Sequence, residues 1–397
     1  MNRHYKENMG LFYLIIYILL IIPLFKPNCI SALYPGINTF LNYYLILSSI
    51  IIFTLYFVNC KISRNLLLII LFLGVLLLTT FINNGDIYSA FLSTIKILSI
   101  GFLIDFSISK KSRFVLMAFE FVFSLLVYIN FISLFIYPNG MYVSSVSGYY
   151  HNWFLGFKNI HILYILPAIL FSYINNYLVN KNVSIRTIVL IIISLFSILK
   201  VWSATGIVGM LLVLFYSIFQ KRVFSSKIYS FKNYMISTIS IFFGVVILRI
   251  QNLFKYFIVD ILKKDLSFTG RVYIWDYVIN YIKKKPMLGY GFEKASVRYS
   301  KGTIPHSYHA HNIILELVYK TGIVGFLIIV LMIRDCGKKL SECKTDIISK
   351  ILSFWIFIYM IITLTEAYDL ELFFYIFTLA ANVKNIILIR KSEQNES

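Results

Sequence analysis

The sequence predicts an all-α, polytopic integral membrane protein that crosses the bilayer about twelve times. Of its 397 residues, 59% are hydrophobic and only 14% are charged, whereas a soluble domain usually has about 25% charged residues. The apolar residues gather in long runs, and a helix needs about 20 of them to span a hydrocarbon core of about 30 Å. Lipid must therefore be the solvent for much of this surface.

Twelve apolar runs are long enough to be considered as spans, with ends defined only to within several residues. They are Leu11–Phe25, Phe40–Val58, Leu66–Phe81, Phe91–Phe106, Phe114–Tyr137, Ile160–Leu178, Ile185–Leu199, Ser203–Phe219, Tyr234–Ile250, Ile313–Ile333, Ile347–Leu364 and Leu370–Ile389. The stretch 185–219 is divided at Lys200-Val201-Trp202, because one uninterrupted helix of that length would overshoot the bilayer. Lys96 lies inside the fourth run, so it must face a protein interior or extend to the membrane surface.

The distribution of basic residues predicts the orientation. Lysine and arginine crowd on alternate short loops, and the intervening loops hold only Lys26, Lys158 and Lys200. Because cytoplasmic loops are the basic ones, both termini are expected in the cytoplasm. The net charge of +20 is then a signal of topology, and no nucleic acid partner is expected. We find no internal repeat and no separate soluble domain, so residues 1–397 are predicted to form one membrane domain.

A long polar loop, about residues 251–311, falls on the outer side in this topology. After Gly270-Arg271 it contains Trp275, Val278 and Ile282 at helical spacing on one face, followed by three lysines. An aromatic amphipathic helix with a basic end suits a membrane interface, so this helix is expected to lie flat on the outer leaflet. The alternative is a surface helix packed on neighbouring loops.

Three of the six histidines, His306, His309 and His311, lie at the end of this loop. Histidines at alternating positions can bind a metal, but the loop offers no clear carboxylate or cysteine partner, so no metal is expected. A histidine at the mouth of a helix can instead act as a general base, because imidazole titrates near neutral pH. We favour this interpretation for His311 over a purely structural histidine.

Two polar residues at the start of the following helix have simpler interpretations. Asn312 is placed to cap the helix. Glu316 and Lys320 are four residues apart on one face and are expected to pair with each other.

The same region carries a recognisable combination of residues in a fixed order. They are Gly270-Arg271, Trp275, Pro286, Gly289-Tyr290-Gly291, His309-Ala310-His311-Asn312, Leu315-Glu316, Gly322-Ile323 and Gly325. Supporting segments are Leu155-Gly156-Phe157-Lys158-Asn159 and Trp202-Ser203-Ala204-Thr205-Gly206-Ile207. Together these residues resemble the O-antigen ligase and Wzy-type polysaccharide polymerase superfamily over roughly residues 145–333.

The resemblance implies a role for two residues. His311 matches the loop histidine proposed to activate the acceptor hydroxyl, and Arg271 matches the arginine proposed to bind the donor pyrophosphate. Ligases commonly have a Ser-Arg pair where this chain has Thr205-Gly206, so a second arginine is missing here.

Three other cations, Lys200, Arg249 and Arg298, are the candidates to replace the missing arginine, although none matches a motif. The supporting residues of the loop are taken to be His309, His306, Asn312 and Glu316.

The function implied by the resemblance is glycan transfer on the outer side of the inner (cytoplasmic) membrane. The polymerase interpretation joins undecaprenyl-pyrophosphate-linked repeat units into O-antigen, capsule or exopolysaccharide, without cofactor or metal. The absence of the second arginine favours this interpretation, and a flippase and a chain-length regulator are expected as further partners. The alternative is an O-antigen ligase that transfers the glycan to a terminal acceptor.

Two rivals belong to other classes of protein. A flippase for lipid-linked oligosaccharides requires charged residues along a path within the helices, and often internal repeats. Here the spans hold few charges, mainly Lys96, and the polar residues gather in one outer loop. A non-catalytic membrane assembly partner is the weaker rival.

Overall fold

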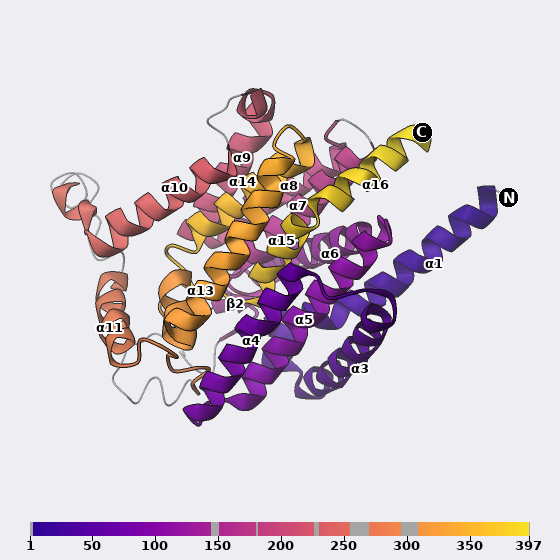
Figure 1. Cartoon of the computed structure of the whole chain (residues 1–397). Helices are drawn as coiled ribbons and strands as arrows, with labels where there is room; N and C mark the ends of the chain where they lie inside the picture. Colours follow the sequence, from indigo (N-terminus) through magenta and orange to yellow (C-terminus); the bar gives the residue numbers. More distant parts are fainter. Residues whose placement is uncertain are drawn as a thin grey trace.

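The computed structural model describes residues 3–143, 151–179, 182–225, 230–254, 270–294 and 309–396. Within these ranges the chain is mainly helical, which confirms the all-α class (Figure 1). The first helices are α1 (Arg3–Ile21), η1 (Ile22–Leu24), α2 (Asn28–Leu33), α3 (Pro35–Asn59), α4 (Arg64–Ile82), α5 (Ile87–Ser109) and α6 (Phe114–Ile136). Those that follow are α7 (His161–Val179), α8 (Ile185–Val201), α9 (Ala204–Ser225), α10 (Phe231–Phe242), η2 (Phe243–Ile247), η3 (Ile250–Phe254), α11 (Arg271–Lys284), α13 (Ile313–Glu342), α14 (Ile347–Ile362), α15 (Glu371–Ala381) and α16 (Val383–Glu396).

The prediction of twelve spans is not confirmed. Among the described residues, six helices are long and apolar enough to cross a membrane: α3, α4, α5, α6, α7 and α13. The pair α15 and α16, bent by 66°, makes a seventh if it counts as one span. The apolar parts of α1, α9, α10 and α14 are shorter, and at about 1.5 Å per residue fewer than 18 residues fall short of a core of about 30 Å. Apolar runs thus form helices where they were expected, but several are too short or too bent to count as single spans.

Both termini point toward the same end of the bundle, and α11 with the start of α13 lies at the opposite end (Figure 1). This arrangement is the one expected if the termini share a compartment and the polar loop faces the other. The cytoplasmic location of the termini stays a prediction.

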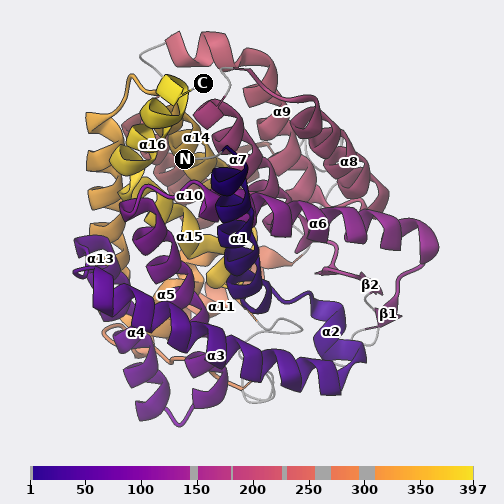
Figure 2. The same ribbon diagram turned by 90° about the vertical axis from the view of Figure 1, so that its right-hand side faces the viewer.

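A small antiparallel sheet leads into α7. Its strands β1 (Tyr142–Val143), β2 (His151–Trp153) and β3 (Gly156–Phe157) lie in that order, with β1 beside α2 and β2 beside α6 (Figure 2). The Leu155 backbone N–H donates to Asn130 Oδ1 at 3.0 Å, which ties the last turn of the sheet to α6. This anchoring fixes the next residues, including Asn159, beside the start of α7.

The predicted break between α8 and α9 is confirmed. Trp202 has a left-handed φ of +51° and ends α8, and its backbone N–H donates to carbonyls of the last turn. Ser203 and α9 follow immediately, so the break places the start of α9 beside the start of α7.

The loop after α11 is locked into a kink in α13. Gly322 has a φ of +62°, and a Cβ at this position would lie 2.1 Å from the carbonyl oxygen of Met287, so a side chain does not fit here. The kink leaves the Tyr319 carbonyl available, and it accepts the Tyr290 backbone N–H at 2.9 Å. Because α11 and α13 are joined in this way, their first residues are held at fixed positions relative to each other.

The apolar face of α11 packs on protein rather than on the outer leaflet, so the flat interfacial placement is wrong. Ile274, Trp275 and Val278 are buried in a cluster that includes Tyr319 of α13 and Phe242 of α10. The amphipathic pattern of α11 is present, but α10 and α13 cover its apolar face. The surface-helix alternative describes α11 better.

Lys96 faces the protein interior, which is one of the two positions expected for it; the other was the membrane surface. Its Nζ lies 2.9 Å from Glu371 Oε1 at the start of α15, and Ser93 also donates to this carboxylate. The charge within the fourth predicted span is therefore neutralised by a partner from a distant part of the chain.

Candidate active site

His311, just before the N-cap residue of α13, has an unusual backbone conformation. His311 has a φ of +46°, a left-handed value that costs a non-glycine residue about 1–3 kcal/mol. The surrounding contacts impose it: Asn312 caps α13 by accepting the Leu315 backbone N–H at 3.0 Å, and its own Nδ2 donates to the Leu364 carbonyl at 2.9 Å. The cap predicted for Asn312 is thus confirmed. It also docks α13 on the segment that follows α14.

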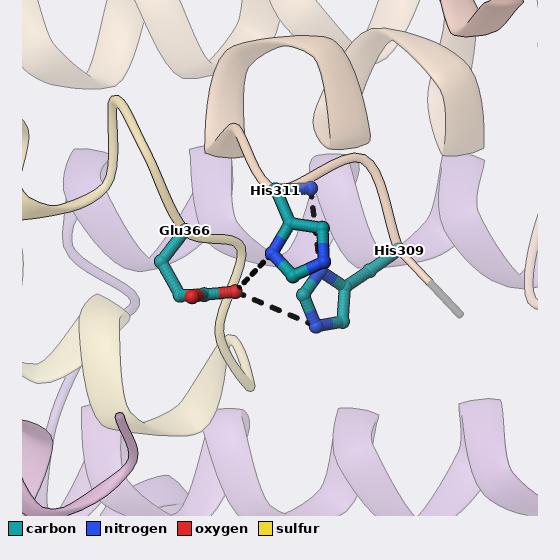
Figure 3. A group of neighbouring side chains, drawn as sticks. All are labelled: His309, His311 and Glu366. Carbon is teal, nitrogen blue, oxygen red and sulfur yellow. Dashed lines mark hydrogen bonds and ion pairs between the residues drawn. The ribbon is translucent and has the colours of Figure 1, made fainter. Parts of the chain in front are cut away.

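That segment supplies the centre of the site, Glu366. Its Oε1 lies 2.6 Å from His311 Nδ1 and 3.6 Å from His309 Nε2 (Figure 3). Its Oε2 accepts from Arg271 at 3.1 Å and from Asn159 Nδ2 at 2.8 Å. One buried carboxylate therefore gathers groups from three other parts of the chain.

The charges around Glu366 favour its ionised form. Burial by itself would raise the pKa of this carboxyl, but it is outweighed by the hydrogen bond with His311, by the charges of His311 and His309 when these imidazoles are protonated, and by the permanent charge of Arg271. The net effect holds the pKa of Glu366 below its usual value. An ionised Glu366 accepts hydrogen bonds only, so His311 Nδ1 carries the proton between them.

This arrangement sets the chemical state of the two histidines. When Nδ1 of a neutral imidazole donates to a carboxylate, Nε2 keeps the lone pair that a base requires, which makes His311 Nε2 the basic atom. His309 Nδ1 accepts the backbone N–H of His311 at 3.2 Å, so a single proton on the His309 ring is on Nε2, the atom nearer Glu366. His311 is therefore the better placed of the two to take a proton.

Arg271 is the first residue of α11, and Gly270 before it has a φ of +84°. The Arg271 guanidinium has five N–H donors in a planar fork, and the contact to Glu366 Oε2 at 3.1 Å uses one nitrogen. Its side chain is 20% exposed, so it is neither fully buried nor free in solvent. The remaining donors can bind an anion such as a phosphate.

A hydrogen-bonded chain extends the site to the start of α9. Ser203 Oγ donates to Asn159 Oδ1 at 2.9 Å and accepts the Gly206 backbone N–H at 3.2 Å. Asn159 in turn donates to Glu366, so the ends of α7 and α9 are coupled to the carboxylate. These contacts explain why the segments around residues 159 and 203 accompany the histidine motif.

Gly206, where ligases commonly have the second arginine, has side chains of neighbouring residues packed against it. A Cβ at Gly206 would lie 2.7 Å from Ile198 Cδ1 and 3.1 Å from Ser203 Oγ. A larger residue at this position would require Ile198 to move, so the glycine belongs to the packing between α8 and α9.

The predicted pair of Glu316 and Lys320 is confirmed at 3.1 Å. Glu316 has a second contact that the sequence did not reveal, since its Oε2 accepts the Ala310 backbone N–H at 2.8 Å. This bond holds the turn between His309 and His311, and the supporting role of Glu316 in the site stays a prediction.

Two of the cations considered as replacements for the missing arginine, Arg249 and Lys200, are described, and both have contacts away from Glu366. Arg249 lies against Trp275 and pairs with Asp276 of α11, and Lys200 lies over the ring of Phe135, 5.0 Å from its centroid. Their part in binding pyrophosphate stays untested. Arg298 and His306 lie outside the described residues.

We expected no metal because the polar loop offers no clear carboxylate near the histidines. That reason is wrong, because Glu366 from a distant segment is such a carboxylate. One ligand atom from each of His309, His311 and Glu366 lies within 4.8 Å of the others. In the structure, however, Glu366 already accepts from Arg271 and Asn159, and the guanidinium places a positive charge beside the cluster. Hydrogen bonds with His311, Arg271 and Asn159 account for the contacts of Glu366 without a metal ion. That no metal is needed stays a prediction.

Glu366 is the site residue that the sequence reasoning missed. It is 55 positions beyond His311 and lies between two apolar helices, in the segment Thr363–Leu370. The available signal was compositional, because Glu366 is a carboxylate in a short segment between two apolar helices, and ionisable residues near membrane spans are candidates for a functional site.

Comparison with known proteins identifies the central part of the chain. Residues 162–330 match the family model described as O-Antigen ligase. This segment is similar to the O-antigen ligase superfamily. The O-antigen-ligase segment contains Arg271 and His311, whereas Glu366 and Asn159 lie outside it.

Two proteins named as polysaccharide ligases also resemble the chain. One, from Rickettsia felis, is 32% identical over 92 residues, which is 20% of this chain and 22% of the relative. The other, from Rickettsia conorii, is 31% identical over 90 residues, 20% of this chain and 21% of the relative. The match thus spans about a fifth of the length of these relatives. The apolar helices and the O-antigen-ligase segment together indicate a multi-pass membrane protein.

Proposed function

We propose that this protein transfers a glycan from a polyprenyl-pyrophosphate-linked donor to an acceptor hydroxyl at the outer side of the cytoplasmic membrane. The observation that carries the proposal is the contact of 2.6 Å between His311 Nδ1 and Glu366, which leaves His311 Nε2 as a base. Arg271 at the same carboxylate adds the cation that a pyrophosphate donor requires.

In the proposed reaction, His311 Nε2 takes the proton from the acceptor hydroxyl. The acceptor oxygen forms a bond to the anomeric carbon, and the bond between that carbon and the pyrophosphate oxygen breaks. The lipid pyrophosphate leaves with the electron pair of the broken bond, and Arg271 stabilises its charge. Glu366 stabilises the imidazolium that forms on His311, as the carboxylate does in other histidine–carboxylate pairs.

The acceptor distinguishes a ligase from a polymerase. The family description and the names of the relatives favour the ligase, which transfers the glycan to a terminal acceptor. The one observation in favour of a polymerase, which elongates a second lipid-linked unit, is Thr205-Gly206 in place of the Ser-Arg pair. We therefore propose the ligase as the first function and the polymerase as the second.

Reconstituted transfer tests the proposal. The purified protein in lipid nanodiscs is given a lipid-linked glycan donor with either a terminal acceptor or an excess of lipid-linked repeat units. A single addition to the terminal acceptor is expected from a ligase, and a ladder of products from a polymerase. If neither acceptor receives sugar although the donor is bound, the transferase proposal is wrong. Movement of intact donor across the bilayer would instead identify a flippase.

A further inference from the structure

The cluster around Glu366 has a second chemical capacity, because its nitrogen and oxygen atoms are also ligands for transition metals. Glu366 Oε1 lies 2.6 Å from His311 Nδ1 and 3.6 Å from His309 Nε2 (Figure 3). One ligand atom from each of the three residues lies within 4.8 Å of those of the other two. Two imidazoles and one carboxylate, with water in the fourth position, are a common ligand set for zinc.

The distances in the cluster are close to those that a tetrahedral ion requires. With metal–ligand bonds of about 2.0–2.2 Å, neighbouring ligand atoms lie about 3.3 Å apart. The separation of 3.6 Å between His309 Nε2 and Glu366 Oε1 is near this value, while the His311 contact has to open by about 0.7 Å. The side chains of His309 and His311 are 36% and 24% exposed, so an ion can enter from solvent between them.

The other oxygen of Glu366 is held by groups that would support a metal ligand. Oε2 accepts from Arg271 at 3.1 Å and from Asn159 Nδ2 at 2.8 Å, which leaves Oε1 toward the histidines. Carboxylates that bind metals are commonly hydrogen-bonded in this way. The positive charge of Arg271 lowers the affinity for a cation. The site therefore suits an ion that binds reversibly rather than one that is permanently bound.

Metal binding would change the position of the proton on both imidazole rings. A metal at His311 Nδ1 takes the lone pair of that atom, so the ring proton moves to Nε2. On His309 the metal takes Nε2 and the proton moves to Nδ1, at the cost of the bond from the His311 backbone N–H. Each ring keeps one proton. His311 Nε2 is then protonated and cannot act as a base.

We propose that His309, His311 and Glu366 bind Zn²⁺ or another divalent transition metal reversibly, and that the bound metal inhibits glycan transfer. The inhibition rests on the proposed function, whereas metal binding by itself does not. The metal is an inhibitor here, and the transfer reaction uses none. Imidazole ligands favour Zn²⁺, Co²⁺ and Cu²⁺ over Mg²⁺ and Ca²⁺, so the inhibition is expected to be selective for transition metals.

Spectroscopy with Co²⁺ tests metal binding without any transfer assay. The purified protein in nanodiscs, free of any histidine tag, is treated with EDTA, dialysed and titrated with Co²⁺. A saturable visible absorption band of four-coordinate Co²⁺ is expected, with one ion per chain. Zn²⁺ should displace the Co²⁺, and the same concentration of Mg²⁺ should not. Because this titration uses the wild-type protein, it does not depend on the folding of a variant.

Three histidine variants assign the ligands. His309→Ala and His311→Ala should each weaken Co²⁺ binding at least tenfold, because two protein ligands remain instead of three. His151→Ala is the matched control, since His151 is an exposed histidine of β2. It should keep the wild-type band. Absence of the band in the wild type, or an unchanged band in both His309→Ala and His311→Ala, would overturn the metal site.

Transfer assays test the inhibition. At a Zn²⁺ concentration ten times the dissociation constant, the wild-type transfer rate should fall about tenfold and recover with EDTA. His309→Ala keeps part of its transfer activity, and that activity should change less than twofold at the same Zn²⁺ concentration. Equal inhibition of both proteins, a full rate in the Zn²⁺-bound wild type, or transfer that requires the metal would overturn the inhibitory role. A protein that binds Co²⁺ at these residues but transfers no sugar after EDTA treatment or with Zn²⁺ would refute the proposed function instead.

Discussion

Glu366 and Glu371 are two buried carboxylates in one short stretch of chain, yet their surroundings differ. Glu371 is neutralised by Lys96 at 2.9 Å, with Ser93 as an additional donor. Glu366 receives His311, His309 and Arg271 as well as Asn159, so the positive or chargeable groups around it outnumber its single charge. A balanced pair is typical of a structural contact within a membrane protein, whereas a surplus of donors at a partly open position can bind an anionic substrate.

The difference predicts that substitutions around Glu366 impair transfer, while substitutions around Glu371 impair stability. The largest expected effect is that of His311→Ala. A base within hydrogen-bond reach contributes about 10²- to 10⁴-fold, so the transfer rate should fall by that amount. Initial rates with a defined lipid-linked donor would measure it, and membrane abundance should stay at the wild-type level. A variant of low abundance but normal specific rate would make His311 a structural residue.

His309→Ala is the matched control for His311. His309 Nδ1 accepts the His311 backbone N–H and its Nε2 is nearer the carboxylate, so it supports the turn rather than taking the proton. We expect a loss of transfer about tenfold smaller than for His311→Ala. Equal losses would mean that the assignment between the two histidines is wrong.

Glu366→Gln is expected to lower the transfer rate by about 10²-fold, because an amide cannot stabilise an imidazolium as a carboxylate does. The affinity for the donor should change less than the rate. Separate measurement of kcat and KM distinguishes these effects. A change confined to KM would indicate that Glu366 acts in binding and does not orient the base.

Arg271→Lys should reduce transfer about tenfold, mainly through a higher KM for the donor. A lysine is a point charge and cannot reproduce the planar fork that contacts Glu366 and a phosphate together. Titration with polyprenyl diphosphate would report the weaker binding. Wild-type affinity in the lysine variant would reduce Arg271 to a general positive charge.

The smallest effect on transfer is expected at the balanced pair. Lys96→Ala leaves Glu371 buried without its cation, which typically destabilises a protein by about 3–5 kcal/mol. The melting temperature in detergent should fall, while the rate per folded molecule should change less than twofold. A large loss of specific rate in a stable Lys96→Ala variant would remove the distinction between the two carboxylates.

Much of the fold followed from local sequence patterns. The break at Trp202 and the cap at Asn312 each depend on a few neighbouring residues. For Lys96 the sequence left two positions open, and the contact with Glu371 decides for the interior. The number of spans was not confirmed, because apolar content alone does not reveal where a helix ends or bends, and several apolar helices are shorter than 18 residues.

The candidate site was predictable only in part. His311 and Arg271 belong to one segment and are recognisable together, whereas Glu366 comes from a segment with no motif of its own. The placement of α11 was wrong for a similar reason, since the helix that covers Trp275 is distant in sequence. In both cases the tertiary partner decides the outcome, and a single sequence does not identify it.

A double-mutant cycle on His311 and Glu366 tests the central claim most directly. Transfer rates are measured for wild type, His311→Ala, Glu366→Gln and the double variant, all with the same donor and acceptor. If Glu366 acts by orienting and stabilising the base on His311, the double variant should be about as slow as His311→Ala alone. If the two losses instead multiply, the residues act independently and the histidine–carboxylate base proposed here is wrong.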